Sequence, residues 1–480
     1  MKKAALALCL GLLAPAMTVV SCDRASQESV EKEQDAETIR LTRARAMIDA
    51  LMTADPAAYE AAAQENYSTE LFARRTSEER ADFVRMIASD LGRMSVDSIV
   101  TDGDTIEIAV AGDSGVTARF VFEFDDTPEQ KIARIGVTAD QGERSAAEIP
   151  SPEISAEMGA AEIAAGVDAW LAPVIEADDF AGVILIAQGG APLMRKAYGL
   201  ADRDAGRAAD MDTAYNIASI GKKFTQVAIA RLIEEERLSL ETKIAEVIPD
   251  YPNDVTAQAT VKQLIDMEGG VADFFGPGFK EQPKNLLNSN HAYYQHVSAK
   301  PPNFAPGERR EYCNGCYVVL GEIIERVEDE PFEAVIQRIV FDPAGMKRSG
   351  YFNAQNPPEN VARLYGRADG PGSRYIDMQD RHGDAGSGAG GAYSTADDLL
   401  KFDNALREGR LLNGAMTVWT LGGGDKEAQR NRAAIGVAGG SDGTNALLYS
   451  NGEWAVIVTA NVSEPLPEQL GVAIGQALMN

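Results

Sequence analysis

Residues 213 to 225 read TAYNIASIGKKFT, with Ser219 and Lys222 three positions apart. Apolar residues then recur with a helical period, at Phe224, Val227, Ala228 and Leu232. This spacing predicts that Ser219 begins a helix and that Lys222 lies on the same face one turn later. A serine hydroxyl becomes a good nucleophile when a neighbour accepts its proton, and a lysine whose ammonium form is desolvated can be that neighbour. The positive N-terminus of the helix also favours negative charge on the reacting oxygen.

The Ser-x-x-Lys spacing alone carries little information, because Ser29 and Lys32 share it inside a polar segment. The surroundings of Ser219 set it apart. Two strand-like runs, 182–187 and 193–198, precede it with a glycine turn between them, and the apolar helix follows it directly. We therefore predict that Ser219 is the nucleophile of a hydrolase.

A second pattern, Tyr312-Cys313-Asn314, has the form Tyr-x-Asn and heads another apolar helix. Together with the segment around Ser219, it resembles the serine β-lactamase and penicillin-binding-protein superfamily, in the branch that holds class C β-lactamases, D-aminopeptidases and related esterases. The resemblance spans about residues 160 to 480. It implies an α+β fold in which an antiparallel sheet is flanked by helices and stands beside an all-α lobe.

The resemblance also implies a role for each matching residue. Ser219 would attack a carbonyl and form an acyl-enzyme, while Lys222 and Tyr312 would share the proton transfers, with the identity of the base left open. Asn314 would hydrogen-bond the substrate and steady Lys222. The N–H groups of Ser219 and Gly440 would form the oxyanion hole. No metal or organic cofactor would be needed.

One element of that family is changed in this chain. The resemblance leads us to expect Lys-Thr-Gly or His-x-Gly on a strand near the C-terminus, but residues 437–440 read VAGG. Gly439 and Gly440 would still let the strand backbone approach a substrate, whereas the cation that would bind a substrate carboxylate is missing. A family histidine is also absent, since Met267 and Glu268 stand in that region. These changes favour a neutral ester or amide substrate.

The preferred function is therefore the hydrolysis of a small ester, amide or peptide. β-Lactamase or D-alanyl carboxypeptidase activity is the second candidate, although both reactions act on substrates that carry a carboxylate. A third candidate is a non-catalytic envelope lipoprotein that keeps the fold in order to bind a peptide or glycan. The missing cation motivates this third interpretation. Composition indicates nothing about the oligomeric state.

The N-terminus has the pattern of an export signal. Two lysines precede an apolar run at 4–20, in the charged, apolar, small order of a secretory leader. The ending VVSC resembles a bacterial lipobox, whose cysteine, Cys22, would be lipidated; cleavage by ordinary signal peptidase near the preceding serine is the alternative. We expect residues 1–22 to be a signal peptide of the lipoprotein type. The mature protein would lie in the periplasm or cell envelope and be anchored to the membrane through Cys22.

The rest of the chain divides by pattern. Residues 23–36 are polar and predict a flexible tether. Residues 37–140 combine helical periods with a later period of two, which predicts a small α+β domain; it resembles the cystatin-like cone of nuclear-transport-factor-like domains. Residues 141–157 are polar with two prolines and predict a linker. Residues 158–480 form the predicted hydrolase domain.

The charge of the chain excludes one class of partner. There are 45 Lys and Arg residues against 73 Asp and Glu residues, which gives a formal net charge of -28. Such a surface repels phosphate backbones, so nucleic acid is not an expected partner.

Three rival patterns are weaker. Residues 439–443 match Gly-x-Ser-x-Gly, but strands follow them and no histidine lies downstream. The three histidines lack the spacing of metal ligands, so no metal site is predicted. Cys313 and Cys316 have the spacing of a redox motif, but they lie within the Tyr-x-Asn element. A structural disulfide between them, or a pair of buried thiols, is preferred to a redox function.

Overall fold

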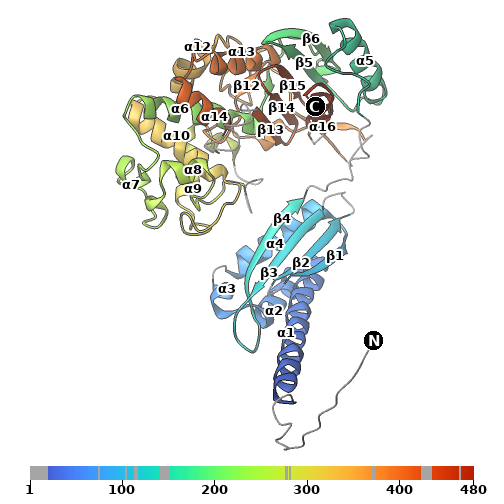
Figure 1. Cartoon of the computed structure of the whole chain (residues 1–480), viewed down its shortest axis with the longest axis vertical. Helices are drawn as coiled ribbons and strands as arrows, with labels where there is room; N and C mark the ends of the chain where they lie inside the picture. Colours follow the sequence, from blue (N-terminus) through green and yellow to red (C-terminus); the bar gives the residue numbers. More distant parts are fainter. Residues whose placement is uncertain are drawn as a thin grey trace, which may run out of the picture. The chain divides into compact units, whose positions relative to one another are not determined.

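The fold is taken from a computed structural model (Figure 1). The residues that it describes are 20–73, 76–102, 105–112, 117–140, 151–275, 279, 283–368, 373–422, 435–463 and 466–479. Most of the predicted signal peptide, up to residue 19, lies outside them. The chain divides into two compact units, Met1–Ala146 and Ala147–Asn480, and each is described by itself.

The N-terminal unit consists of helices followed by a four-stranded antiparallel meander. Its elements are α1 (Val20–Met52), α2 (Pro56–Asn66), α3 (Thr69–Ala73), α4 (Ser77–Leu91), β1 (Met94–Asp102), β2 (Thr105–Gly112), β3 (Thr117–Phe124) and β4 (Ile132–Asp140). The sheet order is β1-β2-β3-β4. Alternate residues of β2 and β3, such as Ile108 and Phe120, are buried in one core with Met47 of α1 and Val84 of α4. The helices therefore cover one face of the meander. The likeness to a cystatin-like cone stays a prediction.

The predicted tether differs from the structure. Residues 23–36 form part of α1, whose backbone is helical from Val20 to Met52. This stretch contains no glycine or proline and is rich in Glu, Gln and Ala, which are strong helix formers. Polarity alone therefore did not make the segment irregular. None of the described helices is both long enough and apolar enough to cross a bilayer.

The C-terminal unit is built around one antiparallel sheet whose strands come from both ends of the unit. The strands are β5 (Gly182–Gln188), β6 (Ala191–Tyr198), β13 (Ile435–Ser441), β14 (Thr444–Ser450) and β15 (Trp454–Ala460). Their order is β13-β14-β15-β5-β6, so that β15 near the C-terminus pairs with β5. All residues of β15 are buried, as expected for a central strand that is covered on both faces.

Helices cover both faces of this sheet (Figure 1). On one face, α5 (Ala160–Glu176) and α16 (Leu466–Met479) pack through residues such as Val167 and Ile474 onto Ile184 and Val458. On the other face, Leu185 and Ile457 belong to a larger core that extends into the helical lobe. The fold class predicted for this unit, a β-lactamase-like antiparallel sheet flanked by helices beside an all-α lobe, is confirmed.

The helical lobe is inserted between β6 and β13. Its helices are α6 (Lys222–Glu234), α7 (Ile244–Val247), α8 (Val261–Ile265), α9 (Asn290–Ser298), α10 (Asn314–Glu328), α11 (Phe332–Ile336), α12 (Asp342–Ala344), α13 (Ala396–Arg407) and α14 (Gly414–Gly422). Short strand pairs border it: β7 (Leu200–Asp202) with β8 (Arg207–Ala208), β9 (Tyr215–Asn216) with β12 (Tyr393–Ser394), and β10 (Tyr365–Arg367) with β11 (Tyr375–Asp377).

Helix α6 is the central element of this lobe, and Phe224 anchors it. The Phe224 ring is fully buried and meets the rings of Phe341 and Phe402 edge to face, with centroids 5.1 and 5.0 Å apart. Such pairs are favourable beyond the apolar area that they bury. Because Phe224 lies two residues beyond Lys222, this contact fixes the start of α6 against α13 and the segment before α12.

We expect Phe224→Ala to lower the free energy of unfolding by about 3–5 kcal/mol, because it leaves a cavity beside the rings of Phe341 and Phe402. Leu286→Ala is the matched control, since Leu286 is 61% exposed and its loss should cost less than about 0.5 kcal/mol. Urea or thermal unfolding of both variants measures the difference. Equal stabilities for the two variants would contradict the proposed anchoring.

Candidate active site

A strained turn presents Ser219 at the entry to α6. Ala218 has φ +43°, a left-handed conformation that is uncommon for a residue with a side chain. The Asn216 side-chain oxygen accepts the Ala218 N–H at 2.8 Å and so supports this conformation. A single 3-10 turn, η1 (Ala218–Gly221), follows and leads directly into α6. Ser219 therefore lies on the turn before the helix, and Lys222 is the first residue of α6.

Lys222 and Tyr312 both reach the Ser219 hydroxyl. The distance from Lys222 Nζ to Ser219 Oγ is 3.0 Å, and the Tyr312 hydroxyl donates to the same oxygen at 2.7 Å. Lys222 Nζ also donates to Asn314 Oδ1 and to the Ala389 carbonyl oxygen, both at 2.7 Å. The four residues predicted from the two sequence motifs are thus brought together, although more than ninety positions separate Ser219 from Tyr312.

The surroundings of the site lower the charge on Lys222. This residue is 6% exposed, and desolvation lowers the pKa of its ammonium group to about 7, while the Asp273 carboxylate opposes part of that shift. Tyr312 is 58% exposed over its whole surface, but desolvation of its hydroxyl is the main reason that the pKa of the phenol is raised. Near neutral pH, the amine can therefore lose its proton while the phenol keeps its own.

Asp273 is a site residue that the sequence did not reveal. Its Oδ2 accepts a hydrogen bond of 2.9 Å from Asn314 Nδ2, and its Oδ1 accepts the Phe275 N–H at 3.0 Å. The first bond orients the Asn314 amide, so that Asn314 Oδ1 faces Lys222. Asp273 lies in an irregular loop after α8, outside any motif, and so no local pattern could have pointed to it.

The edge strand β13 lies against the turn that carries Ser219. A Cβ added at Gly439 would come within 2.3 Å of the Ile217 carbonyl oxygen and 2.8 Å of the Ser219 nitrogen. Glycine is therefore the residue that permits this approach. Gly440 lines a cavity together with Ser219. The strand thus brings main-chain groups to the nucleophile, and its approach to a substrate stays a prediction.

Two cavities meet at Ser219. The first, about 90 Å³, has an aromatic wall that includes Phe274, Tyr293 and Phe352, and it also contains Asn314 and Gly440. The second is larger, about 580 Å³, a volume typical of pockets that hold a small ligand. Its lining includes Lys223, Arg310, Tyr312, Val437 and Ala438. The residues at 437 and 438, where the sequence lacks the expected cation, therefore form an uncharged wall of this second cavity.

Cys313 and Cys316 form a disulfide, with 5.3 Å between their Cα atoms. Both are buried: Cys313 lies between Tyr312 and Asn314, and Cys316 lies in the first turn of α10. The bridge therefore closes the turn that presents Tyr312 and Asn314. Lipidation is predicted for Cys22, but the Cys22 side chain lies outside the described part of the molecule, so this stays a prediction.

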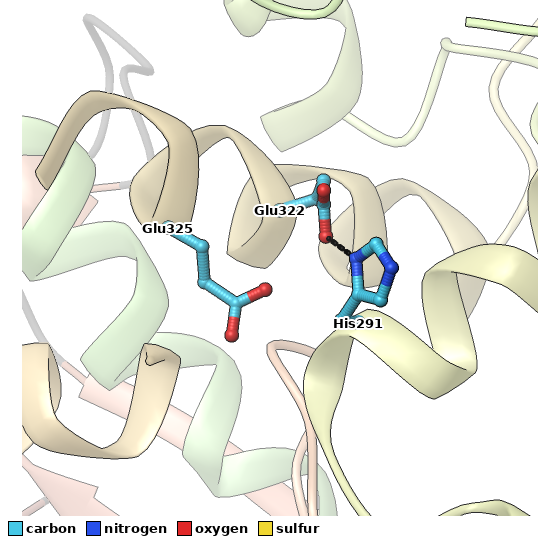
Figure 2. Close-up of side chains that lie close together, drawn as sticks. All are labelled: His291, Glu322 and Glu325. Atoms are coloured by element: carbon cyan, nitrogen blue, oxygen red, sulfur yellow. Dashed lines mark hydrogen bonds and ion pairs between the residues drawn. The ribbon is translucent and has the colours of Figure 1, made fainter. Parts of the chain in front are cut away.

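One group of residues has the composition of a metal site. Figure 2 shows His291 of α9 directed at Glu322 of α10, with Glu325 one turn further along the same helix. The Glu322 carboxylate contacts His291 Nδ1 at 2.9 Å and accepts from Arg326 Nε at 2.8 Å. Glu325 accepts the Phe332 N–H at 2.9 Å. These carboxylates thus have protein partners, and the contact between the exposed His291 and the buried Glu322 joins α9 to α10.

The sheet, the helical lobe and a cleft in which a serine, a lysine and a tyrosine meet define the class of serine hydrolases with a β-lactamase-like fold. Comparison with protein families supports this: the model of the Beta-lactamase family matches residues 167–470. The chain belongs to that family, and it is a serine hydrolase.

Several relatives are similar to this chain. Esterase EstB of Burkholderia gladioli is 27% identical over 286 residues, which are 52% of this chain and 71% of the esterase. Penicillin-binding protein 4* of Bacillus subtilis (strain 168) is 27% identical over 242 residues, 48% of this chain and 53% of that protein. The chain thus spans about half the length of the penicillin-binding relative. A crystal structure of a penicillin binding protein from Bacillus halodurans matches with a TM-score of 0.55 at 25% identity, covering 64% of this chain and 99% of that one.

The packing of β13 on the nucleophile turn gives a prediction. We expect Gly439→Ala to push the strand away from Ser219 and to lower kcat/KM for an ester substrate by roughly 10²–10³-fold, the cost of losing one oxyanion donor. Gly414→Ala is the control, because its Cβ would meet no heavy atom within 4 Å and Gly414 lines neither cavity at Ser219. Steady-state kinetics on both variants tests this. Full activity in the Gly439 variant would contradict the close approach.

Proposed function

We propose that this protein hydrolyses a small ester or amide through an acyl-enzyme on Ser219. One observation carries the proposal: Ser219 Oγ lies within hydrogen-bond distance of both Lys222 Nζ and the Tyr312 hydroxyl where two cavities meet. The similarity to an esterase and to penicillin-binding proteins supports the same class of reaction.

The hydrogen-bond pattern favours Lys222 as the base. A neutral amine has two N–H groups and one lone pair. The Asn314 side-chain oxygen and the Ala389 carbonyl oxygen can only accept, so they take both N–H groups. The lone pair is then left for the Ser219 hydroxyl. Because the Tyr312 hydroxyl donates to the same serine oxygen, it holds a proton that the leaving group can take.

The steps follow from this arrangement. Ser219 Oγ bonds to the substrate carbonyl carbon while its proton passes to Lys222 Nζ. Main-chain N–H groups of Ser219 and Gly440 stabilise the oxyanion. The bond to the leaving oxygen or nitrogen then breaks, and that atom takes the proton of Tyr312, which Lys222 restores. Water then attacks the acyl carbon while its proton passes to Lys222 Nζ. The bond to Ser219 Oγ breaks, the acid leaves, and Ser219 regains its proton.

The alternatives receive less support. A lipoprotein that only binds a ligand does not need a desolvated amine aligned on a serine. Burying the amine costs folding free energy, and such perturbed groups are typical of catalytic sites. β-Lactamase or D-alanyl carboxypeptidase activity stays the second candidate. Export, location in the periplasm or cell envelope and anchoring through Cys22 also stay proposals, which rest on the N-terminal sequence alone.

A fluorophosphonate probe tests the nucleophile. We expect mass spectrometry to find the adduct on Ser219 in the wild-type protein and no adduct in Ser219→Ala. Lys222→Met should slow labelling and the hydrolysis of short acyl esters by roughly 10²–10⁴-fold, the usual contribution of a positioned base. Absence of labelling in a folded wild-type protein would favour the binding lipoprotein instead.

The pH dependence tests the base. Because desolvation lowers the pKa of Lys222 to about 7, kcat/KM should fall below pH 7 as the amine gains a proton. Asp273→Asn removes the carboxylate that raises this pKa, and so the acidic limb of the pH profile should shift to lower pH. Asp397→Asn is a control, since Asp397 pairs with Arg195 on the surface. If the acidic limb stays at the same pH in Asp273→Asn, the Asp273 carboxylate does not raise the pKa of Lys222.

A further inference from the structure

Lys223 is a lysine of the second cavity that the mechanism does not use. It follows Lys222 on α6, and its Nζ donates to Gln226 Oε1 at 3.1 Å and to the Thr420 carbonyl oxygen at 2.9 Å. Both partners are uncharged. Within the described residues, no carboxylate oxygen lies within 4.0 Å of Nζ, whereas many other lysines and arginines of this chain have such a partner.

A desolvated ammonium group without a counterion is costly to maintain. Desolvation is the one cause of the shift that lowers the pKa of Lys223 to about 8, and no neighbouring carboxylate offsets it. The group nevertheless remains mostly protonated at pH 7. Its two acceptors leave one N–H of the ammonium without a protein partner among the described residues. The Lys223 ammonium group thus lines a cavity beside the nucleophile with one N–H left to donate. An anionic group of the substrate could accept that hydrogen bond and neutralise the charge.

The position of Tyr312 tells which part of the substrate occupies this cavity. Under the proposed mechanism, the leaving atom takes its proton from the Tyr312 hydroxyl. Tyr312 lines the second cavity together with Lys223, Val437 and Ala438. The first cavity, with its aromatic wall, also contains Ser219 but neither Tyr312 nor Lys223, and it is free for the acyl group. The leaving group therefore extends into the cavity that contains Lys223.

We propose that Lys223 binds a carboxylate on the leaving group of the substrate, an inference that rests on the proposed hydrolysis at Ser219. It takes the place of the cation that β13 lacks at 437 and 438. The preferred substrate is then an ester or amide whose alcohol or amine carries an acidic group. The carboxylate forms no covalent bond, and the acyl transfer proceeds as described above.

The other charges of the cavity do not provide the same site. Arg310 is exposed at the rim, and its Nε already donates to the Asp266 carbonyl oxygen at 3.2 Å. Asp266 and Glu268 line the cavity near it, so their negative charges oppose that of Arg310. Neither of these acids is among the causes that shift the pKa of Lys223.

Two esters of equal shape test this inference. They are 3-acetoxybenzoate, whose leaving group carries a carboxylate, and 3-acetoxybenzamide, whose leaving group carries a neutral amide in the same place. We expect the wild-type protein to favour the carboxylate ester. In Lys223→Met, the ratio of kcat/KM for the two esters should fall by roughly 10–100-fold, the usual effect of losing a hydrogen bond to a charged group. Lys223→Arg should retain most of the preference.

The control is Lys243→Met, which removes one positive charge from an exposed lysine that also bonds a glutamine. It should leave the ratio unchanged. Fluorophosphonate labelling of Ser219 in each variant checks that the site remains folded. A ratio that is the same in the wild-type protein and Lys223→Met, with both esters hydrolysed, would overturn this inference and leave the proposed function standing. Hydrolysis of neither ester by the wild-type protein would overturn the proposed function itself.

Discussion

The active site depends on one constraint: the Lys222 amine is removed from water and surrounded by oxygen atoms. Asn314 Oδ1 and the Ala389 carbonyl oxygen lie at 2.7 Å, and Ser219 Oγ lies at 3.0 Å. Burial lowers the pKa of the group, which makes a neutral amine available, and the two pure acceptors direct its lone pair. The same burial would be destabilising if any of these oxygens moved away. The packing around Phe224 and the hydrogen bond between Asn314 and Asp273 therefore both hold Lys222 Nζ in place.

The topology of the sheet completes the site. Because β5 pairs with β15, the segments at the two ends of the unit close into one sheet, and β13 becomes its edge. That edge lies against the turn before α6, where Gly439 permits contact with the Ser219 backbone. The nucleophile and the strand beside it are more than two hundred positions apart in sequence. Their contact arises only when the sheet is complete, which ties activity to the folding of the whole unit.

The sequence predicted those site residues that belong to local patterns. Ser219, Lys222, Tyr312 and Asn314 lie at helix starts with recognisable spacing, and the structure brings them together. Asp273 was missed because its role comes from one tertiary contact in an irregular loop. The predicted tether at 23–36 was polar, but polarity does not oppose a helix when the residues are good helix formers. The composition of this stretch predicted a flexible tether, and the helical backbone shows that this prediction was wrong.

The positive charge in the cleft comes from a different element than the family pattern predicts. The missing cation at 437 and 438 predicted a site without a positive charge for a substrate carboxylate, because the family pattern places that charge on one strand. A cavity is lined by several elements, and any of them can supply a cation. Lys223 comes from α6, more than two hundred positions before Val437 in the sequence, yet it lines the same cavity. A missing motif residue therefore shows only that one position lacks the cation. Whether the cavity contains a cation depends on all the residues that line it.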